Sequence, residues 1–407
     1  MTRRFRIVDV DVHVNEPHDL WARYLEPALR SLAPTYRQRE EPKEDWATTT
    51  SRRARLYLAC QREGIAPDVV DRALANAGPE LTQLELGGEL LMTPVMRRAW
   101  QQASLESFIR QLPLLAEGFS APAYVETLRG MGVERAFLYP SIGLLVLAVD
   151  GMEPRLAVAL MRAYNDWLRD YCVRGEGVLV PVGALCRHDP EAMVAELERV
   201  ASWGWKAVTL RPNPQGGRLL GDPVHERFWT RCEELGIAVG LHGGPHSRLP
   251  TAGDDRFRSH FALHATAHPV EQMFALLSLI EGGVLERHPR LRVAFLEGGS
   301  GWLPFWLWHL DNEYEHNGWD VREHVRMRPS DYFRRQCFIA CEPTEPAIEQ
   351  IIDTYGEGCV IYGSDFPHLD HASQVDSDAT LLARRLSPRV ARRVLWDNGC
   401  RFYGIDG

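Results

Sequence analysis

The sequence lacks the features that mark several large classes of protein. Apolar stretches such as residues 142–149 are far too short to cross a bilayer. The 407 residues contain no long run of Lys or Arg and carry a net charge of -9, which argues against a nucleic-acid partner. No hydrophobic segment precedes the first expected strand, so we expect no signal peptide. The sequence therefore predicts a cytoplasmic protein without a membrane segment.

Cysteine pairs of the CxxC type are also missing. The eight cysteines stand mostly inside apolar patterns, at positions 60, 172, 186, 232, 337, 341, 359 and 400. This usage favours buried, reduced thiols rather than a disulfide framework or a zinc site built from cysteines. The hydrophobic fraction of 45% is sufficient for a large core.

Short β-rich apolar runs alternate with helical patterns in the second and larger part of the chain. Strands separated by helices pair in parallel, and eight such units predict a (β/α)₈ TIM barrel, an α/β fold. A doubly wound open sheet is the alternative, but no glycine-rich phosphate loop follows the first strand. The expected strands are residues 6–13, 136–139, 178–184, 207–211, 237–242, 292–297, 337–341 and 359–364.

Residues 15–120 do not follow this alternation. They are charged, rich in Arg, Glu and Pro, and mostly helical in pattern, for example over residues 80–92 and 94–108. Since they follow the first strand, they form an insertion in the first βα loop, on the catalytic face of a barrel. We expect one domain over residues 1–407 in which this insertion is a lid or an arm for a homodimer.

Ionisable side chains stand at the ends of nearly all the expected strands. Active sites of barrels are built at these carboxyl ends, and glycines after them leave room for a ligand. Helix capping could explain one or two carboxylates but not the histidines. The residues at or near strand ends are Asp11, His13, Arg211, His242, Glu297, Glu342 and Asp365.

The first strand reads Val8-Asp9-Val10-Asp11-Val12-His13. Alternation places the two aspartates and the histidine on one face and the valines on the other. A solvated edge strand would also read this way, yet such groups are costly to bury without a metal ion. Asp11 and His13, with His242 and Asp365 of the later strands, would supply two nitrogens and two oxygens. This set suits one divalent ion, Zn²⁺ first, with Mn²⁺, Fe²⁺ or Co²⁺ as alternatives.

The chain resembles the amidohydrolase-related family, in the branch of aminocarboxymuconate-semialdehyde decarboxylase and the dihydroxybenzoate decarboxylases. The resemblance lies in Asp-x-His on strand one, His-Gly-Gly on strand five and Gly-Ser-Asp-Phe-Pro-His on strand eight, with His268-Pro269-x-Glu271 between them. It extends over residues 6–14 and 120–404. It implies a metal-dependent barrel enzyme in which Asp11, His13, His242 and Asp365 hold one metal ion.

Two positions depart from the pattern of this branch. Many members begin His-x-His or Glu-x-His, whereas this chain has Asp11. The decarboxylases usually carry a histidine at the end of strand six, where this chain has Glu297. A glutamate shuttles protons only when its pKa is raised, and it could instead bind the metal or activate water. No lysine ends strand four, so we expect one metal ion rather than two.

Further residues are candidates for the site. Arg211 could clamp a substrate carboxylate or pair with Glu297 or Asp365. His268 could act in catalysis or cap a helix, and it shares a helical face with two other histidines. His368 could bind the substrate, and Trp302 could stack on an aromatic ligand or belong to the core.

These residues support three hypotheses about function. The first is a metal-dependent lyase that decarboxylates a small aromatic or unsaturated acid, with Glu297 or a histidine donating the proton. The second is a hydrolase of an amide, ester, lactone or activated C–C bond, with Asp365 or Glu297 as the base. The third is a degenerate barrel that binds a small molecule without turnover.

Overall fold

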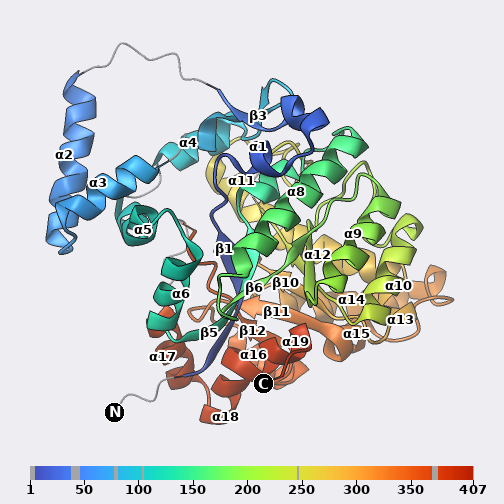
Figure 1. Cartoon of the computed structure of the whole chain (residues 1–407). Helices are drawn as coiled ribbons and strands as arrows, with labels where there is room; N and C mark the ends of the chain where they lie inside the picture. Colours follow the sequence, from blue (N-terminus) through green and yellow to red (C-terminus); the bar gives the residue numbers. More distant parts are fainter. Residues whose placement is uncertain are drawn as a thin grey trace.

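The structure is a computed structural model that describes residues 5–37, 46–77, 81–102, 105–244, 247–368 and 375–406. Its centre is a ring of parallel strands surrounded by helices (Figure 1). The strands are β1 (Ile7–Val14), β5 (Val133–Pro140), β6 (Leu179–Pro181), β7 (Gly183–Ala184), β8 (Ala207–Leu210), β9 (Ala238–His242), β10 (Val293–Leu296), β11 (Cys337–Cys341) and β12 (Val360–Tyr362).

The strands follow one another around the ring in chain order. One sheet runs β1-β5-β6 and the next runs from β7 through β8, β9, β10 and β11 to β12. Only Val182 separates β6 from β7, so these two pieces occupy one strand position. The ring closes where the His13 amide donates to the Phe366 carbonyl oxygen at 2.7 Å and the Asp365 amide donates to the Asp11 carbonyl oxygen at 2.9 Å. The expected (β/α)₈ barrel is confirmed.

Every strand position contributes residues to one hydrophobic cluster, and this cluster fills the inside of the ring. The cluster combines small residues such as Ala207, Ala238 and Ala294 with large ones such as Phe137 and Phe338. Aromatic residues of the C-terminal helix α19 (Asn398–Tyr403) join the same cluster. The barrel interior is therefore a packed core and not a channel.

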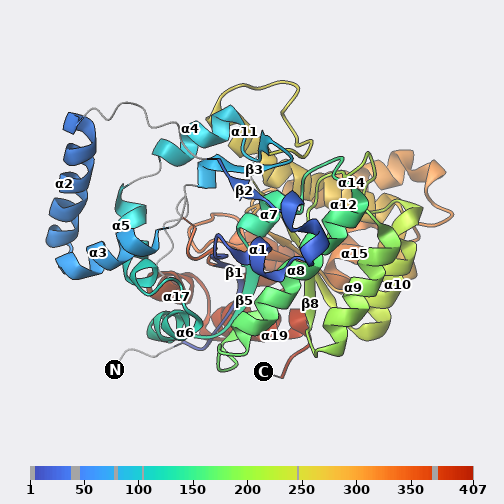
Figure 2. The same cartoon turned by 45° about the horizontal axis from the view of Figure 1, so that its top comes forward.

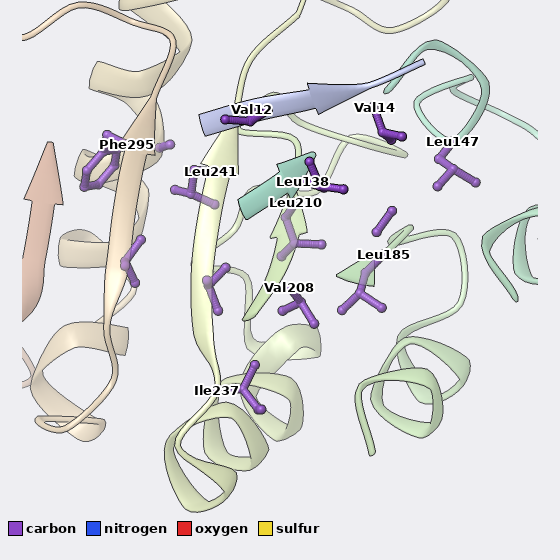
Figure 3. Packing of buried hydrophobic residues seen from close by; sticks show 14 of the residues in the cluster. Val12, Val14, Leu138, Leu147, Leu185, Val208, Leu210, Ile237, Leu241 and Phe295 are labelled. Carbon is purple, nitrogen blue, oxygen red and sulfur yellow. The ribbon is translucent and has the colours of Figure 1, made fainter. Parts of the chain in front are cut away.

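A second and larger cluster joins the strands to the surrounding helices (Figure 3). The helices after the insertion are α6 (Ala121–Gly130), α7 (Ile142–Val146), α8 (Pro154–Cys172), α9 (Pro190–Ser202), α10 (Glu226–Leu235), α11 (His260–Ala267), α12 (Pro269–Glu281), α13 (Val284–Arg287), α14 (Leu303–Asn317), α15 (Pro329–Gln336), α16 (Ile348–Tyr355), α17 (Val375–Arg385), α18 (Pro388–Arg392) and α19, with a π-helical turn, η5 (Arg393–Asp397), before the last.

Strand β1 does not alternate as the sequence predicts. Val8 and Val10 pack inside the barrel, whereas Val12 belongs to the cluster between strands and helices. The pairing of β1 with β5 shifts its register between Asp9 and Val12, as at a β-bulge. The expectation that the three valines share one face is therefore wrong, because the bulge turns the end of the strand.

The insertion after β1 contains α1 (Leu20–Tyr24), η1 (Pro27–Leu32), β2 (Thr35–Tyr36), α2 (Trp46–Arg62), α3 (Pro67–Asn76), η2 (Leu81–Gln83), β3 (Leu84–Leu86), β4 (Glu89–Leu90), α4 (Pro94–Gln102) and α5 (Leu105–Ala116). Figures 1 and 2 show α2, α3 and α5 projecting from one side of the barrel, and these helices share a small apolar cluster of their own.

The sequence predicts a helix over residues 80–92, and this prediction is wrong. Strands β3 and β4 pair there as an antiparallel hairpin, to which β2 adds a third strand. Gly87 and Gly88 form the turn with φ of 64° and 80°, a conformation that ends a helix but suits a tight hairpin.

The cysteines are free thiols, as the sequence predicts. The eight cysteines form no disulfide, and all except Cys172 are buried. Among the described residues, no helix is both long enough and apolar enough to cross a membrane.

Candidate metal centre

Four side chains from three strand ends meet at the mouth of the barrel. Asp11 and His13 come from β1, His242 is the last residue of β9, and Asp365 follows β12. The His13 Nε2 atom lies 3.0 Å from the Asp365 Oδ1 atom and 2.9 Å from the His242 Nε2 atom. The Asp11 Oδ1 atom lies 3.2 Å from the His242 Nε2 atom. All four residues are buried, and their ligand atoms lie within 4.8 Å of one another.

The hydrogen bonds of the two imidazoles determine which nitrogen faces the cluster. The His13 Nδ1 atom contacts the Pro140 carbonyl oxygen at 2.9 Å, and the His242 Nδ1 atom contacts the Gly243 carbonyl oxygen at 3.0 Å. A carbonyl oxygen only accepts, so each neutral ring carries its hydrogen on Nδ1. When both rings are neutral, as binding of a cation requires, both Nε2 atoms direct lone pairs into the cluster, beside the buried Asp11 Oδ1 atom, which has no hydrogen-bond partner. Burial opposes protonation of His13, but its hydrogen bonds with Asp11 and Asp365 raise its pKa to about 9, so a proton takes the place of the cation when no ion is bound. This arrangement fits a metal ion.

The charges in the cluster also favour a cation. Burial alone would raise the pKa of Asp365, but the adjacent His368 and His13 hold it well below its usual range. Burial likewise acts to raise the pKa of Asp11, yet the nearby imidazoles of His242 and His13 lower it. Two ionised carboxylates in a dry pocket require positive charge, which a divalent ion supplies.

Glu297 follows β10 and lies directly behind His242. Its Oε2 atom is 3.4 Å from the His242 Nδ1 atom and 3.5 Å from the His268 Nδ1 atom. Glu297 and Asp365 are two of the few non-glycine residues with positive φ, at 51° and 55°. Such a backbone costs on the order of 1–3 kcal/mol, and strained residues of this kind cluster at functional sites. The geometry joins Glu297 to His242 on one side and to His268 on the other.

His268 and His368 both reach the site. His268 is buried at the junction of α11 and α12, where it is the N-cap residue of α12 but makes no capping bond with its side chain. The ring of His368 stacks on that of His13 with centroids 3.8 Å apart, and its Nδ1 atom lies 2.9 Å from Asp365 Oδ1. Glu297, Asp365 and His368 also form a second group of possible ligands.

Arg211 is near the site, whereas Trp302 is not. The Arg211 guanidinium donates to the carbonyl oxygens of Gly243 at 2.9 Å and Gly244 at 3.3 Å. Burial lowers the pKa of Arg211 to about 10, and the negative charge of Glu297 opposes this effect. Trp302 packs edge-on against Phe295, with centroids 6.1 Å apart, among the residues between strands and helices. This position does not favour the prediction that Trp302 stacks on a ligand.

A cavity of about 150 Å³ lies beside the cluster, at the ends of β10, β11 and β12. Besides Asp11 and Asp365, its lining includes Glu297, Glu342 and Asp378. The sequence identified Glu342 at the end of a strand but not Asp378, which belongs to helix α17. Burial raises the pKa of Asp378 to about 6, with the hydrogen bond to Tyr362 opposing this effect and the nearby Glu342 adding to it.

The sequence also gave no sign of Glu16. Its buried carboxylate accepts hydrogen bonds from the amides of Ser141, Ile142 and Gly143, at 3.1, 2.9 and 2.9 Å. It thereby fixes the turn after Pro140, whose carbonyl oxygen orients His13. Glu16 falls in the segment without strand alternation, so the rule of strand ends could not find it.

The chain matches one known family and several known proteins over more than half of its length. A family model described as amidohydrolase matches residues 134–405. A 2-amino-3-carboxymuconate-6-semialdehyde decarboxylase of Dictyostelium discoideum is 25% identical over 260 residues, which is 62% of this chain and 69% of the relative. A gamma-resorcylate decarboxylase of Rhizobium sp. (strain MTP-10005) is 28% identical over 272 residues, or 63% of this chain and 79% of the relative.

Solved structures share the fold. An amidohydrolase from Mycobacterium avium subsp. paratuberculosis has a TM-score of 0.69 at 20% identity. The alignment covers 100% of this chain and 99% of the amidohydrolase chain. A dihydroxybenzoic acid decarboxylase from Polaromonas sp., solved with bound manganese and an inhibitor, has a TM-score of 0.58 at 18% identity and covers 69% of this chain and 85% of its own.

Proposed function

The chain belongs to the amidohydrolase family, and on this premise we propose that it is a metal-dependent carboxy-lyase acting on a small aromatic or unsaturated carboxylic acid. The observation that supports this most is the pair of imidazole lone pairs flanked by the carboxylates of Asp11 and Asp365. Both relatives described above are named as decarboxylases. One divalent ion held by these four residues is the expected cofactor.

The donor set of two nitrogens and two carboxylate oxygens suits zinc and manganese alike. Zinc is the first expectation from the sequence, and the manganese in the Polaromonas structure makes manganese the first alternative. When bound, the ion would polarise and hold an oxygen of the substrate. The side chains of the protein would carry out the remaining steps.

In the proposed reaction a proton is added to the carbon that bears the carboxylate, the C–C bond breaks and CO₂ leaves. Glu297 and His268 are the proposed proton carriers, because their carboxylate and Nδ1 atoms lie 3.5 Å apart and Glu297 lines the cavity beside the cluster. A proton passed from His268 to Glu297 would arrive next to the metal ligands. Arg211 and His368 are proposed to hold the substrate.

Hydrolysis is the second candidate, favoured by the acidic lining of the cavity. Glu297, Glu342 and Asp378 would repel a second carboxylate there, and Glu297 or Asp365 could instead take a proton from water. Incubation in oxygen-18 water separates the two reactions. A lyase releases CO₂ and leaves no label in the organic product, whereas a hydrolase incorporates label into it.

The experiment that tests the first proposal is a screen of hydroxybenzoates and related unsaturated acids with the manganese- or zinc-loaded protein, recording CO₂ release. We expect release with at least one acid and none after metal removal. Label in the product without CO₂ would favour the hydrolase. Ligand binding without either reaction would favour the non-catalytic barrel.

We also propose a cytoplasmic homodimer. Exposed aromatic side chains lie on neighbouring helices, with Phe274 on α12 and Phe305 and Trp308 on α14, and their exposed fractions are 51%, 58% and 62%. An apolar surface of this kind suits a second copy of the chain. Sedimentation of the purified protein at several concentrations would measure the oligomeric state.

A further inference from the structure

Two buried arginines follow neighbouring barrel strands on the side away from the acidic cavity. Arg187 comes three residues after β7 and Arg211 directly after β8. Their exposed fractions are 3% and 8%. Both line a second cavity, of about 20 Å³, together with Pro140, Thr209 and Gln215. A space of this size accepts a carboxylate head or a water molecule but not an aromatic ring.

The hydrogen bonds of both guanidinium groups are incomplete. Arg187 donates through its Nη atoms to the carbonyl oxygens of Arg218 and Asn213, and Arg211 donates in the same way to Gly243 and Gly244. The Nε atoms of both arginines are buried and have no partner. Within the described parts of the chain, neither guanidinium forms an ion pair with a carboxylate. Asp150 and Glu271 act on Arg187 only through longer-range attraction.

Two positive charges therefore remain close together without direct neutralisation. Burial, together with the adjacent charge of Arg211, lowers the pKa of Arg187 to about 10. Burial has the same effect on Arg211, and the negative charges of Glu297 and Glu271 offset it only in part, so the pKa of Arg211 is also about 10. Both side chains are still protonated at neutral pH. Buried, unpaired charges are costly unless a ligand of opposite charge completes the site.

The arginine cavity is joined to the metal centre through two carbonyl groups. The Gly243 carbonyl oxygen accepts from Arg211 and also contacts the ligand His242. Pro140 lines the cavity, and its carbonyl oxygen contacts the ligand His13. The metal centre and the arginine cavity therefore adjoin each other, and the arginine cavity lies apart from the acidic cavity at β10, β11 and β12.

We propose that Arg187 and Arg211 form a subsite for a second carboxylate of the substrate, which would make the substrate a dicarboxylic acid held at the metal by one end and at the arginines by the other. The assignment of the first carboxylate to the metal rests on the proposed function. The guanidinium groups offer the donors that carboxylates bind most strongly.

The test is a calorimetric titration of the metal-loaded protein with benzoate and with isophthalate, terephthalate and glutarate, which carry two carboxylates at different spacings. We expect at least one dicarboxylate to bind about tenfold more tightly than benzoate. In Arg187→Met this advantage should disappear while the affinity for benzoate stays within about twofold. Arg227→Met, which removes an exposed arginine paired with Glu191, is the matched control and should behave as the wild type.

Three results would overturn the proposal. The dicarboxylates could bind no more tightly than benzoate to the wild type, a comparison that requires no variant. The tighter binding of dicarboxylates could also survive in Arg187→Met. If that variant does not fold, the same result in Arg187→Lys would count, because lysine keeps the charge but loses the planar fork. Chloride could raise the melting temperature of the wild type but not of the variant, without any dicarboxylate advantage, which would assign the pocket to an inorganic anion.

These titrations need no turnover, so they separate this proposal from the proposed function. Dicarboxylate binding that depends on Arg187, without CO₂ release from any acid, supports the subsite and contradicts the lyase. CO₂ release from a monocarboxylic acid, with the same KM in Arg187→Met and no dicarboxylate advantage, supports the lyase and contradicts the subsite.

Discussion

The Nε2 atoms of His13 and His242 lie 2.9 Å apart, and the Nδ1 atom of each ring contacts a carbonyl oxygen. Two neutral imidazoles in this arrangement repel each other through their lone pairs unless a cation or a proton stands between them. Asp11 and Asp365 add negative charge at the same point. The stability of this part of the barrel should therefore depend on metal.

Metal removal is expected to destabilise the protein. A ligand present at about one hundred times its Kd stabilises the folded state by roughly 2.7 kcal/mol, if it does not bind the unfolded chain. Thermal unfolding after chelation, and again after addition of manganese or zinc, measures this effect. We expect the melting temperature to fall and then recover, with no recovery on addition of magnesium. An unchanged melting temperature throughout would contradict a buried metal centre.

Glu297→Gln should keep the metal ion and lose turnover. The amide has the shape of the carboxylate but cannot exchange a proton with His268, 3.5 Å away. We expect kcat to fall by about a hundredfold or more, with an unchanged metal content. Glu323→Gln, which changes an exposed glutamate, is the control. Full activity of Glu297→Gln would assign proton transfer to a histidine alone, and loss of the metal would make Glu297 a ligand.

Asp378 should make stability depend on pH. Burial raises its folded pKa from 3.8 to about 6. The folded state therefore binds more protons than the unfolded state between these values, and the stability present at low pH is lost as the pH rises through about 6. The expected loss is on the order of 1–2 kcal/mol after allowance for solvent screening of this half-buried group.

The measurement is the unfolding free energy of metal-free wild type and Asp378→Asn in denaturant at pH 4.5 and pH 7. The difference between variant and wild type should shift in favour of the variant as the pH rises. An equal difference at both pH values would show that Asp378 titrates normally.

Gly240→Ala should weaken the barrel interior. A Cβ atom at this position would lie 2.2 Å from the Tyr139 hydroxyl oxygen, which is hydrogen-bonded to Tyr403 at 3.1 Å. Overpacking of this kind costs about 1–3 kcal/mol. In a Tyr139→Phe background the clash is relieved, so the same substitution should cost less. Gly130→Ala, with open space around it, is the control. Equal costs in both backgrounds, measured by urea unfolding, would contradict the contact.

Much of the site could be predicted because one geometric rule governs it. The carboxyl ends of parallel strands meet at one face of a barrel, so polar residues at those ends become neighbours even when hundreds of residues separate them. This rule identified Asp11, His13, His242 and Asp365, and it placed Glu297 beside them. The same rule, applied to the residues that follow β7, would also have identified Arg187.

The rest depends on features that spacing does not encode. The bulge in β1 separates Val12 from Val8 and Val10, and no residue type in this strand predicts a bulge. The direction of Trp302 is set by packing against Phe295. The hairpin of β3 and β4 replaces an expected helix because two glycines form a turn between short apolar runs.

Elemental analysis of the purified protein and of His242→Ala tests the central claim most directly. We predict about one divalent ion per chain in the wild type, zinc or manganese, and its loss in His242→Ala but not in the control His316→Ala, whose imidazole is exposed. Two ions per chain would make Glu297 and His368 ligands of a second metal. No ion in the wild type, even after reconstitution, would contradict the metal centre and the lyase proposed from it.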